Sequence, residues 1–327
     1  MRELKNEIAW SWSRDSVYRR CKRAYYWTYY GSWGWWSEDA SATQRKAGFL
    51  KALSDLDRLV GSSIHEPLAV AIHLRRPGER GVPFERIATQ AREMFERCVR
   101  LARRRIGDGV DDARSGAGQL AERYYGSADV EERVVQARVK LESNLEGLRQ
   151  SPYARIPFAH AAHDLLWVDP VAHTAIMSPS ETWDAQRTTL ADGTTIYGSP
   201  DVVVKGNDGF VHILDWKTGR LSAPGDLQIG AYALFIHRKL GTPLEEMKGH
   251  FVHFLAPDEH QAVAIDALAE KAALVHGMIV EFLRDLGARL TDPRANRADD
   301  IERFPMIEPG PICARCKFRE LCGRAGV

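Results

Sequence analysis

The sequence Gly198-Ser-Pro-Asp201-Val-Val-Val is typical of a β-strand, and so is Ile213-Leu-Asp215-Trp-Lys217-Thr-Gly219. In a strand, side chains alternate between the two faces, so Asp215 and Lys217, two positions apart, point the same way. Apolar residues flank Asp201 in the first segment. The two segments therefore bring two acids and one lysine to the end of a sheet.

The connection Lys205-Gly-Asn-Asp-Gly209 joins these segments and supplies the Gly and Asn residues that a tight antiparallel hairpin needs for positive φ. Such a hairpin places Asp201 beside Asp215. Two carboxylates bind a hard divalent ion through oxygen, and the ammonium of Lys217 can serve an attacking water or the charge on a phosphate. The pattern predicts phosphodiester hydrolysis; surface charges at a strand end are the simpler alternative.

Composition limits the other possibilities. The chain has 327 residues, of which 44% are hydrophobic and 27% charged, and its formal net charge is +1. Such a balance predicts a globular protein whose nucleic-acid surface, if it has one, is a local patch. No apolar run reaches the roughly 18 residues of a membrane helix, and the N-terminus lacks a signal-peptide core. We therefore predict a cytoplasmic protein without a membrane partner.

The order Pro200-Asp201, then Asp215-Trp216-Lys217, resembles the pattern that names the PD-(D/E)XK nuclease superfamily. The resemblance implies an α/β restriction-endonuclease-like core, a mixed central sheet flanked by helices. It also implies a metal-dependent DNA nuclease in which Asp201 and Asp215 bind Mn²⁺ or Mg²⁺, aided by the backbone carbonyl of Trp216. Lys217 then orients the water or stabilises the nonbridging oxygens.

Further residues resemble RecB-type nucleases. Gly61-Ser-Ser-Ile-His65 matches their G-x-x-x-H sequence, in which the histidine binds the catalytic metal. Gln228 and Tyr232 are four apart, and hence on one helix face, and match the accessory Q-x-x-x-Y motif that helps hold the substrate strand or the lysine. A histidine ligand shifts the metal preference towards manganese.

The cysteine pattern points to a second metal site. Cys313, Cys316 and Cys322 form a C-x2-C-x5-C sequence, and Cys21 is the obvious fourth ligand. A site built from both ends of the chain would remove the entropy of a very large loop. Four thiolates suit either Zn²⁺ or a [4Fe–4S] cluster, and the spacing alone does not separate them.

A resemblance to known nucleases favours the [4Fe–4S] cluster over Zn²⁺. The segment from Ser11 or Ser13 through Cys21, Arg23, Tyr25 and Tyr26, together with the terminal cysteines, is similar to the iron–sulfur branch of RecB-like nucleases. This branch includes CRISPR-associated nucleases of spacer acquisition, exonuclease V and the AddB nuclease domain. The resemblance implies an exonuclease on single-stranded or frayed DNA, in DNA repair, recombination or CRISPR antiviral defence, with helicase or CRISPR adaptation proteins as partners.

The predicted organisation is a single nuclease domain over residues 1–327. It contains iron–sulfur segments at 1–36 and 291–327, joined by a four-cysteine staple, a helical insertion at 83–150 and a catalytic sheet core at 160–260. The alternative function is a non-catalytic iron–sulfur protein that binds DNA or acts as an adaptor. A redox sensor is a third, which leaves the acids and the lysine unexplained.

Two features stay open. Trp33, Trp35 and Trp36 follow an aromatic and basic segment and suit either a stacking platform for unpaired bases or an aromatic lid packed on the core, and the usual burial of large aromatics favours the lid. Glu181, on a segment with strand-like composition, is an outside candidate for a further acid at the site.

Overall fold

The computed structural model describes residues 5–75, 81–104, 118–170, 184–219, 226–255 and 262–324. The chain divides into two compact units. The first comprises Met1–Leu56, Glu96–Val134 and Val280–Val327, and the second Asp57–Phe95 and Val135–Ile279. Among the described residues, no helix is long and apolar enough to cross a membrane.

The second unit is built around a five-stranded mixed sheet with the order β1-β4-β5-β6-β7. Its strands are β1 (Leu165–Val168), β4 (Val202–Lys205), β5 (Val211–Lys217), β6 (Met247–His253) and β7 (Ala262–Ile265). Only β5 and β6 are parallel, and the other neighbours are antiparallel. Because a parallel pair needs a crossover, α11 (Asp226–Leu240) makes the connection. A separate hairpin pairs β2 (Arg187–Thr189) with β3 (Thr195–Tyr197).

The expected hairpin between β4 and β5 is present. Val202 pairs with Leu214 and Lys205 with Val211, and Gly209 in the turn has a φ of +85°. The valines of β4 are buried in succession, as is most of β5, which is the pattern of strands covered on both faces. The burial of this hairpin fixes its register, since a slip of one residue would reverse every side chain.

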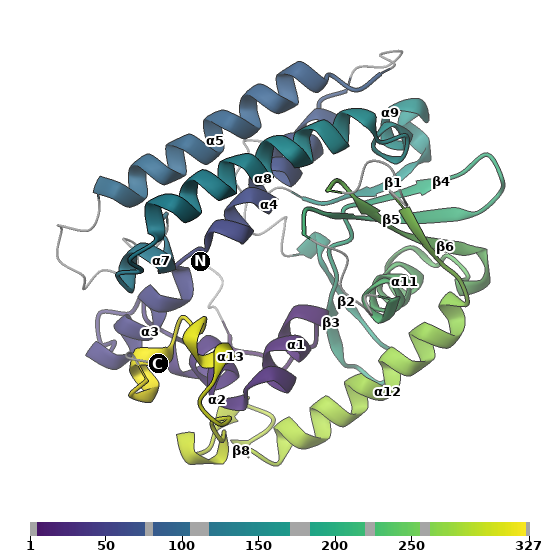
Figure 1. Cartoon of the computed structure of the whole chain (residues 1–327). Helices are drawn as coiled ribbons and strands as arrows, with labels where there is room; N and C mark the ends of the chain where they lie inside the picture. Colours follow the sequence, from purple (N-terminus) through teal and green to yellow (C-terminus); the bar gives the residue numbers. More distant parts are fainter. Residues whose placement is uncertain are drawn as a thin grey trace. The chain divides into compact units, whose positions relative to one another are not determined.

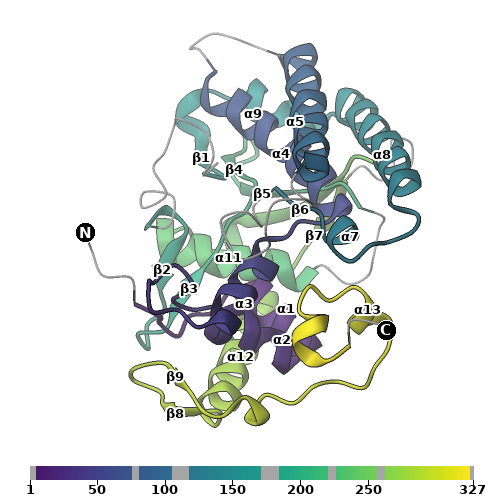
Figure 2. The ribbon, with the colours of Figure 1, turned by 90° about the vertical axis from the view of Figure 1, so that its left-hand side faces the viewer.

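Helices cover both faces of the sheet (Figures 1 and 2). One face carries α4 (Leu56–His73) and the neighbouring long helices α5 (Phe84–Arg104) and α8 (Val130–Gln150), and the opposite face carries α11. Short segments complete this unit: η3 (Tyr153–Arg155), α9 (Ile156–Ala159), η4 (Ala162–Asp164) and η5 (Leu244–Glu246). The two long helices lie within the residues expected as a helical insertion.

The first unit joins segments from both ends of the chain. Its elements are α1 (Trp12–Arg20), α2 (Lys22–Tyr26), the π-helical η1 (Trp27–Gly31), α3 (Ala42–Ala52), α7 (Ala121–Tyr124), the end of α12 (Leu268–Gly287), β8 (Leu290–Asp292), β9 (Arg297–Ala298), η6 (Ile301–Arg303), α13 (Pro311–Ala314) and η7 (Arg319–Cys322). Buried residues of α2, η1 and α3 form an apolar cluster with Phe318. Residues 1–36 and 291–327 thus contribute to the same unit.

Substituting Gly147→Ala in α8 should destabilise the second unit. A Cβ at Gly147 would lie 1.6 Å from the carbonyl oxygen of Phe254, so backbone must move to admit it. We expect the free energy of unfolding, measured by urea denaturation, to fall by about 1–3 kcal/mol. Gly277→Ala in α12 is the matched control, because a Cβ there meets nothing within 4 Å and alanine favours helix by up to about 1 kcal/mol. Equal stability of the two variants would contradict this packing.

Candidate metal and nuclease site

The antiparallel pairing of β4 and β5 brings two carboxylates together at one sheet end. Continuing the register of Val202 with Leu214 by one residue sets Asp201 opposite Asp215. Asp201 is 7% exposed and Asp215 4%. Burial, followed by the nearby charge of Asp201, raises the pKa of Asp215 above its ordinary value. Two acids this close and this buried call for positive charge between or beside them.

Helix α4 supplies the first partner. His65 Nδ1 lies 3.0 Å from Asp201 Oδ1, and the His65 ring meets the indole of Trp216 edge to face. Burial alone would lower the pKa of His65, but the charge and hydrogen bond of Asp201 raise it overall. One turn earlier, a Cβ on Gly61 would stand 3.3 Å from the Thr218 hydroxyl, so the G-x-x-x-H glycine permits close approach of the helix to the end of β5.

The backbone of β5 holds the same carboxylate from the other side. The amide N–H of Trp216 donates to Asp201 Oδ2 at 2.6 Å, and the Trp216 side chain is buried. Asp201 thus accepts contacts on both oxygens, which fixes its orientation. The role of the Trp216 carbonyl as a metal ligand stays a prediction.

Lys217 supplies positive charge to the site. Its Nζ forms an ion pair with Asp215 Oδ2, in keeping with their shared face of β5, and lies 4.9 Å from the centre of the Phe251 ring. Nζ also donates to Gln228 Oε1 at 3.0 Å, and Gln228 Nε2 donates to the Tyr232 hydroxyl at 2.9 Å. Burial raises the pKa of Tyr232 well above its ordinary value, so this phenol stays neutral. Gln228 therefore contacts the lysine directly, and Tyr232 is linked to the lysine through Gln228.

Sequence reasoning missed one acid, Asp169, which directly follows β1. Its backbone N–H donates to the carbonyl of Asp201 at 2.9 Å, and its carboxylate accepts hydrogen bonds from Ser199 and Gln186. Burial is the main cause that raises the pKa of Asp169 to about 7. The hydrogen bond from Ser199 lowers this pKa, and the negative charge of Asp201 raises it. The only signal was a polar residue at the end of an apolar strand. Glu181, the acid that we considered instead, lies outside the described residues.

The donor set fits a divalent cation. Hard carboxylate oxygens from Asp201 and Asp215 together with the imidazole of His65 suit Mg²⁺ or Mn²⁺. In the described part of the chain, no group of three or more His, Cys, Asp and Glu side chains converges closely enough to hold an ion. Instead, Asp201 contacts the imidazole of His65, and Asp215 pairs with the ammonium of Lys217.

The four predicted cluster ligands all lie in the first unit. Cys21, Cys316 and Cys322 pack against its apolar cluster, and burial raises the pKa of Cys316 and Cys322, with charge interactions among the three thiols. The contacts of Cys313 differ, since its Sγ accepts a hydrogen bond from Arg324 at 3.0 Å. Among the described residues these thiols do not converge into a group that could hold a metal, so no iron–sulfur staple is evident and the four-cysteine site stays a prediction.

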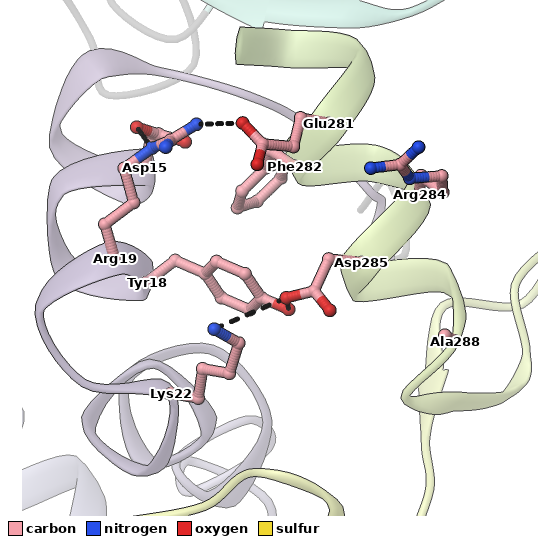
Figure 3. Close-up of a pocket in the computed structure, with 9 residues that line it drawn as sticks. All are labelled: Asp15, Tyr18, Arg19, Lys22, Glu281, Phe282, Arg284, Asp285 and Ala288. Atoms are coloured by element: carbon pink, nitrogen blue, oxygen red, sulfur yellow. Dashed lines mark hydrogen bonds and ion pairs between the residues drawn. The ribbon is translucent and has the colours of Figure 1, made fainter. Parts of the chain in front are cut away.

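A pocket of about 450 Å³ lies between α1 and the end of α12 in the first unit (Figure 3). Ion pairs cross it, from Arg19 to Glu281 at 3.1 Å and from Lys22 to Asp285 at 3.4 Å. The buried Asp15 on its wall also pairs with Arg19, at 2.7 Å. Each of these three acids is therefore paired with a basic side chain, and we assign the pocket no catalytic role.

The comparisons with known proteins agree with this geometry. The family model described as the PD-(D/E)XK nuclease superfamily matches residues 9–323. Searches of curated proteins and of solved structures gave no match. The mixed sheet flanked by helices fits the fold of that family. Since the match covers nearly the whole sequence, the chain belongs to the PD-(D/E)XK nuclease superfamily.

Proposed function

We propose that the protein is a metal-dependent DNA nuclease that acts as an exonuclease on single-stranded or frayed DNA. The observation that carries the proposal is the buried pair Asp201 and Asp215 with Lys217 on the same strand face as the second acid. Members of the superfamily are typically nucleases that use divalent metals such as Mg²⁺ or Mn²⁺. The particular substrate and the direction of cleavage belong to the proposal.

In this mechanism Asp201, Asp215 and His65 would hold the divalent ion, with the Trp216 carbonyl as a further ligand. When bound, such an ion lowers the pKa of a water and offsets charge on the phosphate. The Trp216 amide and His65 keep Asp201 in one orientation, so its oxygens need little rearrangement on metal binding. Entry of the ion also relieves the repulsion between the two acids.

Lys217 then acts on the reacting phosphate. A bound ion would offset the charge of Asp215, and the Lys217 ammonium would then be available to orient the attacking water and to stabilise the nonbridging oxygens. Water adds to phosphorus, one P–O ester bond breaks, and the leaving oxygen takes a proton. Gln228 and Tyr232 position Lys217 for this role through their hydrogen-bond chain.

We further propose that the chain belongs to the iron–sulfur branch of RecB-like nucleases. Support comes from Cys21, Cys316 and Cys322, which approach the same apolar cluster from opposite ends of the chain. A [4Fe–4S] cluster on these residues and Cys313 would be a structural staple within the first unit. In this branch the activity would serve DNA repair, recombination or CRISPR spacer acquisition, with helicase or adaptation proteins as partners.

Removing the lysine should abolish hydrolysis. We expect Lys217→Ala to cut the cleavage rate of end-labelled single-stranded DNA with Mn²⁺ at least about hundredfold, because a donor to the developing charge is lost. Gln228→Ala should give a smaller loss. The control is Lys248→Ala, at the opposite end of the parallel pair, where Lys248 lies beside His212 and pairs with Asp208. Equal rates for wild type and Lys217→Ala would contradict the assignment, and an inert protein that binds DNA would favour an adaptor.

Removing an acid should prevent metal binding. Asp215→Asn should weaken Mn²⁺ binding, measured by calorimetry, and lower cleavage at least about hundredfold, because one anionic ligand is lost. Asp208→Asn is the control, since Asp208 is exposed in the hairpin turn and pairs with Lys248. Undiminished Mn²⁺ binding by Asp215→Asn would place the metal elsewhere.

The cysteine proposal has its own test. Protein purified without oxygen should contain iron and acid-labile sulfide, and Cys21→Ser or Cys316→Ser should lose both and unfold more readily. Cys98→Ser is the control, because Cys98 lies within α5, remote in sequence from the predicted ligands. Zinc in place of iron would leave the staple but refute the cluster, and a metal-free wild type would refute both.

A further inference from the structure

One face of α3 supports an aromatic segment of the first unit. Gln44, Gly48 and Lys51 follow the i, i+4, i+7 spacing of a helix stripe. Gln44 Nε2 donates to the carbonyl of Trp33 at 3.1 Å, and a Cβ on Gly48 would lie 2.4 Å from Cγ of Trp35. The indole of Trp35 therefore rests directly on the helix backbone, and the stripe spans roughly 10 Å along the axis.

Trp36 is not buried as an interior lid would be, whereas Trp35 packs against the apolar cluster of the first unit. The Trp36 ring lies edge to face with Trp33 at 5.2 Å and with Trp35 at 5.9 Å between centroids. Trp36 is 43% exposed, and its two neighbours are partly exposed. The expectation of burial is thus wrong for Trp36. Its ring is held by two partners and still offers a surface to solvent.

Cations gather at the Lys51 end of the same stripe. Lys51 Nζ lies 5.6 Å and Arg14 Cζ 4.5 Å from the centre of the Tyr29 ring. Lys51 is exposed as a whole, but partial burial of its ammonium, followed by the charge of Arg14, lowers its pKa. Within the described ranges, no carboxylate lies at ion-pair distance from Lys51. An anion placed here would offset the repulsion of two like charges.

We propose that this face binds single-stranded DNA, with bases stacked on the tryptophans and phosphates held by the two cations. We call it the Trp36 surface, defined by Arg14, Tyr29, Trp33, Trp35, Trp36 and Lys51. The inference rests on the proposed function, because it assigns to the nuclease a second region that holds its substrate strand.

The chemistry of the surface selects this occupant. Exposed indoles stack on unpaired bases of any sequence, whereas bases inside a duplex are covered by their neighbours. At about 3.4 Å per stacked nucleotide, a 10 Å stripe suits about three nucleotides. An apolar protein partner would instead bury Lys51 without an opposite charge, which is costly.

The experiment measures fluorescence anisotropy of a labelled oligothymidylate with EDTA present, so that binding is separated from cleavage. Trp36→Ala should weaken binding at least about fivefold, and Trp36→Phe, which keeps a stacking ring, should retain most of it. Lys51→Gln should reduce the slope of log affinity against log salt by about 0.7. Lys46→Gln is the matched control on the same helix, because Lys46 pairs with Glu320 at 3.1 Å.

Each outcome bears on the proposal. If Trp36→Ala and Lys51→Gln bind as the wild type does while the wild type still degrades DNA with Mn²⁺, the Trp36 surface is refuted and the nuclease function stands. A wild type that neither binds nor cleaves DNA refutes both. A change of oligomeric state in Trp36→Ala without a change in affinity would make the surface a contact between copies. If Trp36→Ala fails to fold by circular dichroism, Trp36→Phe compared with Lys51→Gln decides.

Discussion

Electrostatic repulsion between two buried carboxylates is the constraint on which the second unit depends. Asp201 and Asp215 occupy facing ends of β4 and β5, and burial weakens the screening that water would give. Asp201 contacts the imidazole of His65 from α4, and Asp215 pairs with the ammonium of Lys217 from β5. The contact between His65 and Asp201 joins α4 to this end of the sheet.

The contacts that hold α4 and α8 against this end of the sheet involve Thr218, the residue after β5. Gly61 of α4 approaches the Thr218 hydroxyl, and Asn144 of α8 donates to the Thr218 carbonyl at 3.3 Å. Gly147, one turn along α8, lies against the carbonyl of Phe254 just beyond β6. The two glycines thus let α4 and α8 approach the sheet closely near the acids, and Asn144 adds a hydrogen bond there.

The positions of the two acids in the hairpin could be predicted from the local sequence. The alternation in β5 and the glycine turn at Gly209 were enough to place Asp201 beside Asp215. The resemblance supplied His65, which is 136 positions from Asp201 along the chain. Asp169 was not predicted as a site residue, because it is the pairing of β1 with β4 that places it beside Asp201. The usual burial of large aromatics favoured a lid for the three tryptophans, but Trp36 is exposed, and Trp35 is the one that packs on the backbone of α3 at Gly48.

The hydrogen-bond directions in α11 indicate what its motif acts on. Gln228 uses its carbonyl oxygen for the Lys217 ammonium, which cannot accept, so its amide nitrogen is left to donate to Tyr232. The Tyr232 oxygen therefore accepts this hydrogen bond, and the raised pKa of the phenol keeps its hydroxyl group protonated. Gln228 thus contacts Lys217 through its oxygen and Tyr232 through its nitrogen. The glutamine and the tyrosine of this protein therefore hold the lysine, which in the proposed mechanism is the residue that acts on the phosphate.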